Sequence, residues 1–188
     1  NEQFTGWTAN DFNFLNNFRL DIIAGQYSLY FENDQSKQIF GKNGEYNTPI
    51  YHTLKDLKRF WNINTTNLVV SAWHGSTLAD SAKLYMVNRF VYHIPDASSK
   101  FYAGYVAHYI NLIPEFMKGN HPVFSLNGFA YAGSTSLGIP PKIVLGDGIF
   151  EDYDAIGFGD VAPQAVLAHV CGHHIQIQNN LFTTTKTS

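Results

Sequence analysis

The sequence is poor in charge and in cysteine, and each shortage excludes a class of protein. Of its 188 residues only 14% are charged, with 12 Lys and Arg against 15 Asp and Glu and a net charge of -3. No basic stripe or tail is present, which argues against a nucleic-acid partner. The one cysteine, Cys171, excludes an internal disulfide framework and cysteine-rich zinc fingers. No apolar run approaches the ~18 residues of a membrane-spanning helix, so we expect no transmembrane segment.

What the sequence does contain is enough apolar residues for a folded core. Hydrophobic residues make up 45% of the chain, which excludes disorder caused by low hydrophobicity. The length fits one domain on a prior of roughly 100–200 residues per domain. Oligomeric state and partners cannot be read from these numbers.

The apolar spacing divides the chain into an N-terminal appendage, residues 1–47, and a main domain, residues 48–188. In the appendage, Asp11 can cap a short helix. The alternation over Gln26–Glu32 predicts a strand, and Lys37–Phe40 can return as its hairpin partner. A loop rich in Gly and Asn then marks the boundary.

The main domain begins with helical spacing and ends with a helix after two strands. Thr48-Pro49 starts a helix with one apolar stripe, and Leu78–Phe90 again keeps helical spacing. Asp96 or Ser98 can cap a further helix. Strands are predicted over His121–Ala132 and Lys142–Phe150, and a helix capped by Asp160 over about 161–178. This order of helices, strands and a final helix predicts the α+β class.

The chemistry is concentrated in the last predicted helix, over Ala168–Gln176. His169 and His173 are four residues apart, so on a helix their imidazoles project from the same face. Two such side chains can bind one Zn²⁺ at about 2.0–2.1 Å. Gly172 leaves the helix surface open between them. The apolar residues before His169 indicate that the helix lies in a core.

This segment resembles the active-site helix of the zincin superfamily, H-E-x-x-H, and more closely the A-H-E-x-G-H-H-x-Q helix of bacterial neutral zinc metallopeptidases. The resemblance implies a zincin-like α+β fold, with helices packed on a small sheet and a buried active-site-type helix near the C-terminus. It implies zinc as cofactor, His169 and His173 as metal ligands, and hydrolysis of a peptide or protein substrate by zinc-activated water. It also implies that an edge strand, for which Lys142–Leu145 is the candidate, binds the substrate backbone. A secreted or cell-envelope location is expected.

Two departures from the family pattern predict an impaired enzyme. Val170 occupies the position of the general-base Glu, and the proton transfer that such a base provides typically contributes about 10²–10⁴-fold. A catalytic zinc site takes three protein ligands, but no Asp, Glu, His or Cys follows His174, and the metzincin position of the third ligand is Asn179. We therefore expect a domain that lacks its C-terminal part.

Other candidates are weaker, and an alternative function stays open. We expect His174 to pack or to orient its neighbour, and Cys171 to be a small buried residue. An acidic segment has no regular ligand spacing and is expected to be a solvated loop: Asp147, Glu151, Asp152 and Asp154. Three histidines could in principle supply a distant third ligand: His74, His108 and His121. The alternative function is that of a pseudopeptidase, catalytically dead and acting as a binding or structural module.

Overall fold

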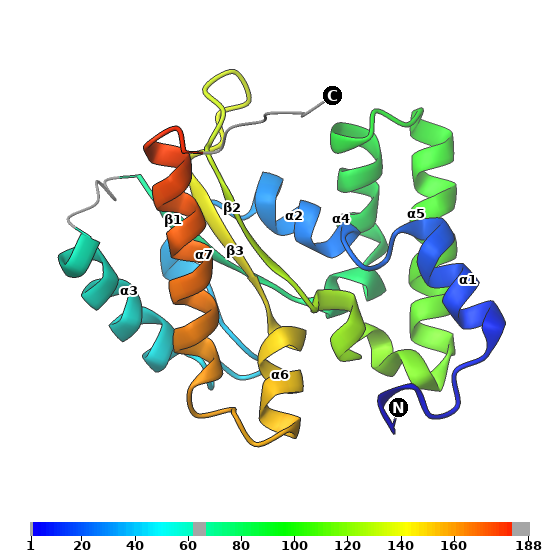
Figure 1. The fold of residues 1–188 in the computed structure, drawn as a ribbon. Coiled ribbons are helices and arrows are strands. Elements are labelled where there is room, and N and C mark those ends of the chain that lie inside the picture. The colour runs from blue at the N-terminus through cyan, green and yellow to red at the C-terminus, as the bar shows by residue number, and fades with distance from the viewer. Residues whose placement is uncertain (1, 62–66, 182–188) are drawn as a thin grey trace, which may run out of the picture.

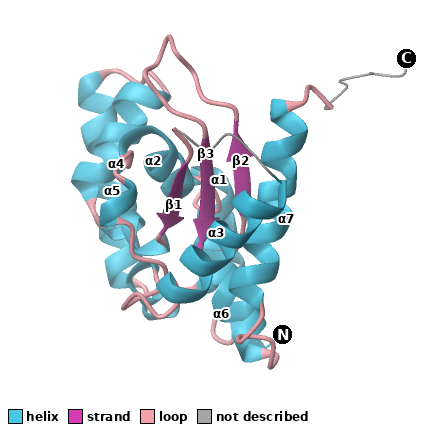
Figure 2. Cartoon of the chain, turned by 90° about the vertical axis from the view of Figure 1, so that its left-hand side faces the viewer, coloured by secondary structure: helices cyan, strands magenta, loops and turns pink. Residues whose placement is uncertain are grey.

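A three-stranded mixed sheet lies between two groups of helices in the computed structural model, which describes residues 2–61 and 67–181. The strands are β1 (Val69–Trp73), β2 (Gly128–Tyr131) and β3 (Lys142–Gly146), in the order β1-β3-β2. β1 is parallel to β3, and β2 is antiparallel to it. Figure 2 shows β3 between its two neighbours. The expected α+β class is confirmed, with far more helix than strand.

One face of the sheet is covered by α3 (Asn47–Trp61) and α7 (Ala162–Gln178), to the left of the strands in Figure 1. Alternate strand residues point to this face because successive side chains of a strand lie on opposite sides. Together with both helices they form a core of buried residues: Ile50, Leu54, Val70, Ala72, Ile143, Leu145, Val166, Leu167, Val170 and Cys171. The helix that carries the histidine motif is thus part of the core.

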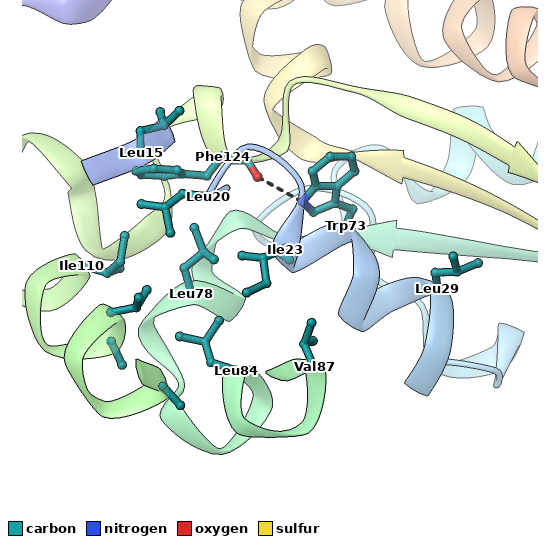
Figure 3. Packing of buried hydrophobic residues seen from close by; sticks show 14 of the residues in the cluster. Leu15, Leu20, Ile23, Leu29, Trp73, Leu78, Leu84, Val87, Ile110 and Phe124 are labelled. Carbon is teal, nitrogen blue, oxygen red and sulfur yellow. Dashed lines mark hydrogen bonds between the residues drawn. The ribbon is translucent and has the colours of Figure 1, made fainter. Parts of the chain in front are cut away.

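The opposite face is covered by α2 (Ile23–Phe31), α4 (Ser81–Met86), α5 (Asp96–Leu112) and α1 (Ala9–Phe18). Trp73, at the end of β1, is 1% exposed and contributes to this second core. Its indole Nε1 donates a hydrogen bond of 3.0 Å to the carbonyl of Phe124 (Figure 3). This bond ties the end of β1 to the segment that leads into β2.

A buried lysine fastens α2 to the centre of the sheet. Lys142, the first residue of β3, is completely buried. Its Nζ donates to the carbonyls of Ser28, Leu29 and Glu32 at 3.0, 2.5 and 3.0 Å, and to the side chain of Asn33 at 2.8 Å. Carbonyls at a helix C-terminus have no partner within the helix, so the ammonium group satisfies them. Residues before position 47 are therefore packed on the sheet, while the proposed division of the chain into two units stays a prediction.

The predicted N-terminal strand and hairpin are wrong. Most of Gln26–Glu32 lies in α2. Lys37 ends a short 3₁₀ helix, η2 (Gln35–Lys37), and the residues after it up to Phe40 form no strand. The alternation was misleading because α2 lies between the sheet and α4, so apolar residues occupy several of its sides. Such a helix lacks a single polar face, and its pattern cannot be distinguished from that of a strand.

Two further expectations about strands are corrected. Strand structure within His121–Ala132 is confined to β2, after a 3₁₀ turn, η6 (Pro122–Ser125). β3 ends at Gly146, and α6 (Asp147–Ala155) replaces the predicted end of the strand and the acidic loop. Asp147 starts that helix, where a negative charge is favourable. β3 is also the central strand, so the prediction of Lys142–Leu145 as a substrate-binding edge is wrong.

The predicted helices exist, with shifted ends. Thr8 rather than Asp11 is the N-cap of α1, although the Asp11 side chain completes the capping box. The spacing over Leu78–Phe90 is divided among η3 (Gly75–Ala79), α4 and a π-helical turn, η4 (Val87–Val91). None of the helices in residues 2–61 and 67–181 combines the length and the apolar character needed to cross a membrane.

Candidate metal-binding site

α7 presents one side to the core and the other to solvent. Val170, Cys171 and His174 are almost fully buried on its inner side, whereas His169 is exposed and His173 half-buried. A helix with a 3.6-residue period brings positions 169 and 173 to one face, one turn apart. The predicted projection of the two imidazoles from the same face agrees with this arrangement.

The two imidazoles lie close enough to share one ligand. Their Nε2 atoms are 3.0 Å apart, and the rings are nearly perpendicular at 86° with centroids 4.6 Å apart. A tetrahedral zinc ion about 2.0–2.1 Å from each nitrogen needs a separation of about 3.3 Å. Nδ1 of His173 lies 3.0 Å from Oε1 of Gln176, a contact that favours the tautomer with the proton on Nδ1, in which Nε2 accepts the hydrogen bond from Nε2 of His169. The pair therefore fits two ligand positions of a zinc site.

Gly172 contributes open space beside the pair. A Cβ at this position would have no other atom within 4 Å, so a methyl group there would not clash. Open space therefore surrounds this position of α7.

An apolar pocket of about 480 Å³ lies next to His169. Its walls come from α6, from the segment that leads into α7, from α7 itself and from the start of β2. The residues that line it include Gly128, Ile149, Tyr153, Phe158, Ala165 and Val170. Since β2 pairs with β3 on one side only, the pocket lies beside an edge strand of the sheet. A side chain from an extended peptide at this edge would find an apolar environment.

The remaining residues of the motif are packed in the core. Val170 is 2% exposed and provides no proton acceptor to the pocket that it lines. Cys171 is completely buried, and burial raises the pKa of its thiol. His174 is 1% exposed, and burial lowers the pKa of its imidazole. Neither ring nitrogen of His174 has a hydrogen-bond partner among the described residues.

The structure brings no third ligand to the pair. Across residues 2–61 and 67–181, no group of three or more His, Cys, Asp or Glu side chains could hold one metal ion. His108 is exposed on α5, across the sheet from α7. His121 is buried against Trp7, with Nε2 2.9 Å from the carbonyl of Gln3. Among the described residues, the candidate ligands that lie together are therefore His169 and His173 alone.

A second group of titratable side chains lies at the ends of two strands, and from the sequence its members were considered separately. His74 directly follows β1, and Asp147 directly follows β3. His74 Nδ1 lies 2.5 Å from Asp147 Oδ2, and Asp147 Oδ1 accepts a 2.8 Å hydrogen bond from the backbone N–H of Gly41. Glu151 lines the same pocket, of about 210 Å³. The prediction of a solvated acidic loop is thus wrong for Asp147, which is 7% exposed.

The signal that would have joined these residues is their position at strand ends. Side chains that follow neighbouring parallel strands meet at one edge of the sheet, where α/β proteins often bind ligands. The pairing of Trp73 with Gly146 puts His74 and Asp147 side by side. Sequence alone did not identify the ends of β1 and β3, so the pair was missed.

Comparisons with known proteins found no match among family models, curated proteins or solved structures. The resemblance to zincins therefore rests on the nine residues of α7 over Ala168–Gln176. The function is argued below from the geometry of the site.

Proposed function

We propose that α7 carries a zinc site of the metallopeptidase type, bound through Nε2 of His169 and Nε2 of His173, and that peptide hydrolysis at this site is impaired. The observation that carries the proposal is the 3.0 Å separation of the two Nε2 atoms on one accessible helix face. This distance is close to the one that a tetrahedral ion requires. Without zinc, the same distance lets one Nε2–H donate a hydrogen bond to the other Nε2, and a bound zinc ion would replace that proton.

Zinc, when bound, would act as a Lewis acid toward a water molecule or a peptide carbonyl. The chain's own contribution is to bind and orient. Gln176 favours one tautomer of His173, and the apolar pocket accepts a side chain. The unpaired edge of β2 has N–H and C=O groups with which an extended peptide can pair. The substrate edge proposed here is thus β2 rather than β3.

Val170 limits the chemistry of this site. At its position the family pattern has a carboxylate, which accepts a proton from the attacking water. A valine side chain has no lone pair and cannot do this. We infer that hydrolysis by this chain is slower by about 10²–10⁴-fold than with a carboxylate in the same place.

The second candidate function is a pseudopeptidase that binds a peptide without cleaving it. The pocket and the edge of β2 favour this function, because they are present whether or not a proton acceptor stands at position 170. Binding in this case depends on burial of an apolar side chain and on backbone pairing. Zinc contributes to the affinity for the peptide, but the bound peptide is not cleaved.

Metal titration of the purified protein tests the zinc site. We expect one equivalent of zinc to bind, measured by competition with a chromophoric chelator. Binding should be lost in His169→Ala and in His173→Ala, and kept in the matched control His108→Ala, which removes an exposed histidine of α5. If the unaltered protein takes up no zinc at micromolar concentration, or if His108→Ala loses it equally, the proposal is wrong.

A peptide assay separates the two functions. The zinc-loaded protein is incubated with an extended peptide that has one large apolar side chain, and both binding and cleavage are followed. Slow cleavage that disappears in His169→Ala supports the impaired peptidase. Binding that is weakened by Ala165→Trp, which fills the pocket, together with no cleavage over days, supports the pseudopeptidase.

A further inference from the structure

The pair of His74 and Asp147 occupies a position suited to ligand binding that is separate from α7. Both residues follow parallel strands of the sheet, at the end where the crevice of an α/β sheet lies. The pocket there holds about 210 Å³ and is lined by polar residues that include Lys42, Ser76 and Glu151. It shares no lining residue with the apolar pocket beside His169.

The backbone around the pair is packed so closely that its geometry is fixed. A Cβ at Gly75 would lie 2.3 Å from the carbonyl oxygen of Gly119, and one at Gly148 would lie 2.0 Å from that of Pro122. Only glycine permits such approach. Gly75 follows His74, and Gly148 follows Asp147. The backbone next to each member of the pair is therefore packed against another segment, at Gly119 and at Pro122 respectively.

Asp147 orients the imidazole of His74. Its Oδ2 binds Nδ1, and its Oδ1 is held by the N–H of Gly41, so the carboxylate has a defined position. His74 Nε2 has no hydrogen-bond partner among the described residues, and the side chain is 29% exposed. A histidine in the wall of a pocket, oriented by a carboxylate on one ring nitrogen, is the arrangement of an oriented general base.

The surroundings raise the pKa of both His74 and Glu151. Burial lowers the pKa of His74, but the hydrogen bond and the charge of Asp147, with a contribution from Glu32 and against Lys83, raise it overall. For Glu151, burial and then the charges of Asp147 and Glu45 raise the pKa to about 7. Lys42 opposes this shift and Asp152 adds to it. Groups that titrate near the working pH are the effective acids and bases.

We propose that this pocket is a second, hydrolytic site for small acyl esters, in which His74 is the general base and Glu151 the general acid. His74 Nε2 accepts a proton from water, whose oxygen forms a bond to the acyl carbon. The bond from that carbon to the alkoxy oxygen breaks, and the alkoxide takes the proton of the Glu151 carboxyl group. The products are the carboxylic acid and the alcohol. The proton gained by His74 returns to Glu151 through solvent, which restores the site.

An ester of low molecular weight fits the chemistry of the pocket. Its volume of about 210 Å³ suits a short acyl chain. Asp147 and Glu151 both line the pocket, so an uncharged substrate avoids repulsion from a carboxylate there. An alkoxide is a leaving group that a carboxylic acid with a pKa of about 7 can protonate.

Hydrolysis of ethyl acetate by the full chain, followed by the release of acid in the presence of EDTA, is the test. We expect a bell-shaped pH profile near neutrality and a fall in kcat/KM of about 10²-fold or more in His74→Gln and Glu151→Gln. His108→Gln is the matched control, because it removes an exposed histidine far from the pocket. Equal rates in His74→Gln and His108→Gln would overturn the proposal.

Asp147 is a positioning residue, and its variant gives a readout that a purely structural role would not change. Asp147→Asn removes the negative charge that raises the pKa of His74, so the acid limb of the profile should move to lower pH. An unmoved acid limb would contradict the mechanism. If Asp147→Asn does not fold, the pKa of the His74 imidazole is measured by NMR in the unaltered protein. The mechanism requires a pKa above 6.5, the ordinary value for histidine. A measured pKa at or below 6.5 contradicts the mechanism.

The outcome is distinguishable from that of the zinc site. Activity that survives EDTA and the double variant His169→Ala/His173→Ala, but not His74→Gln, belongs to the second site. Activity that is lost with EDTA and kept in His74→Gln overturns the second site and supports the zinc site instead.

Discussion

Val170→Glu introduces the carboxylate that the zincin pattern has at this position, and the structure predicts both its cost and its gain. Val170 is 2% exposed among the core residues of α7, and its side chain also lines the apolar pocket. Removing a buried valine loses up to about 1.5–3 kcal/mol of apolar burial, of which the methylenes of Glu recover a part. Raising the pKa of the new carboxyl group by one unit costs about 1.4 kcal/mol more.

The pocket limits this cost, because a carboxylate at position 170 can turn into its volume of about 480 Å³ and reach water. We therefore expect the free energy of unfolding to fall by about 2–3 kcal/mol in total. For a chain of this length that corresponds to a decrease in Tm of roughly 4–12 °C. Urea unfolding measures the change, and Val170→Gln, which has the same shape without the charge, isolates the part due to ionisation.

The gain is measured on a quenched fluorescent peptide with one equivalent of zinc. If the missing base limits hydrolysis, zinc-loaded Val170→Glu should be about 10²–10⁴-fold faster than Val170→Gln. The rate should depend on pH through the titration of the new carboxyl group. A folded, zinc-loaded Val170→Glu that is no faster than Val170→Gln would refute the reasoning that Val170 limits the chemistry.

Two further substitutions test the packing. Gly148→Ala should lower the free energy of unfolding by about 1–3 kcal/mol, because its Cβ would meet the Pro122 carbonyl, whereas Gly104→Ala, which meets nothing within 4 Å inside α5, should raise it by about 0.5–1 kcal/mol. Urea unfolding of both checks this, and equal effects would contradict the close approach at Gly148. Burial lowers the pKa of His174 below 6.5 in the folded state, so its contribution to stability is present above pH 6.5 and is lost as the pH falls below it. His174→Leu should reduce this loss between pH 7 and 5, while His108→Leu, at an exposed position, should leave it unchanged.

The sequence predicted helices better than strands, for physical reasons. α3 has one side on the core and one in solvent, so its apolar spacing was informative, whereas α7 was recognised from its apolar run and the expected cap before it. α2 is packed between the sheet and α4 and has no such contrast, and it was taken for a strand. The end of β3 was missed because Gly146 and Gly148 look like interruptions of a strand. They are positions where backbone segments touch, on either side of the first residue of α6.

The candidate sites divide in the same way. His169 and His173 are joined by local geometry, since a helix repeats every 3.6 residues and their spacing alone brings them together. His74 and Asp147 are separated by 73 positions and meet only because β1 and β3 are neighbours in the sheet. Pairing of distant strands is a tertiary property, and the spacing of residues along the chain has no information about it.

The central claim is that Nε2 of His169 and Nε2 of His173 bind one zinc ion. Side-chain ¹⁵N NMR of the imidazoles during a zinc titration tests it most directly. We predict that the Nε2 resonances of both residues shift together and saturate at one equivalent, while Nδ1 of His173 stays protonated in its contact with Gln176. A titration in which only one of the two residues responds, or in which neither does, would contradict the account.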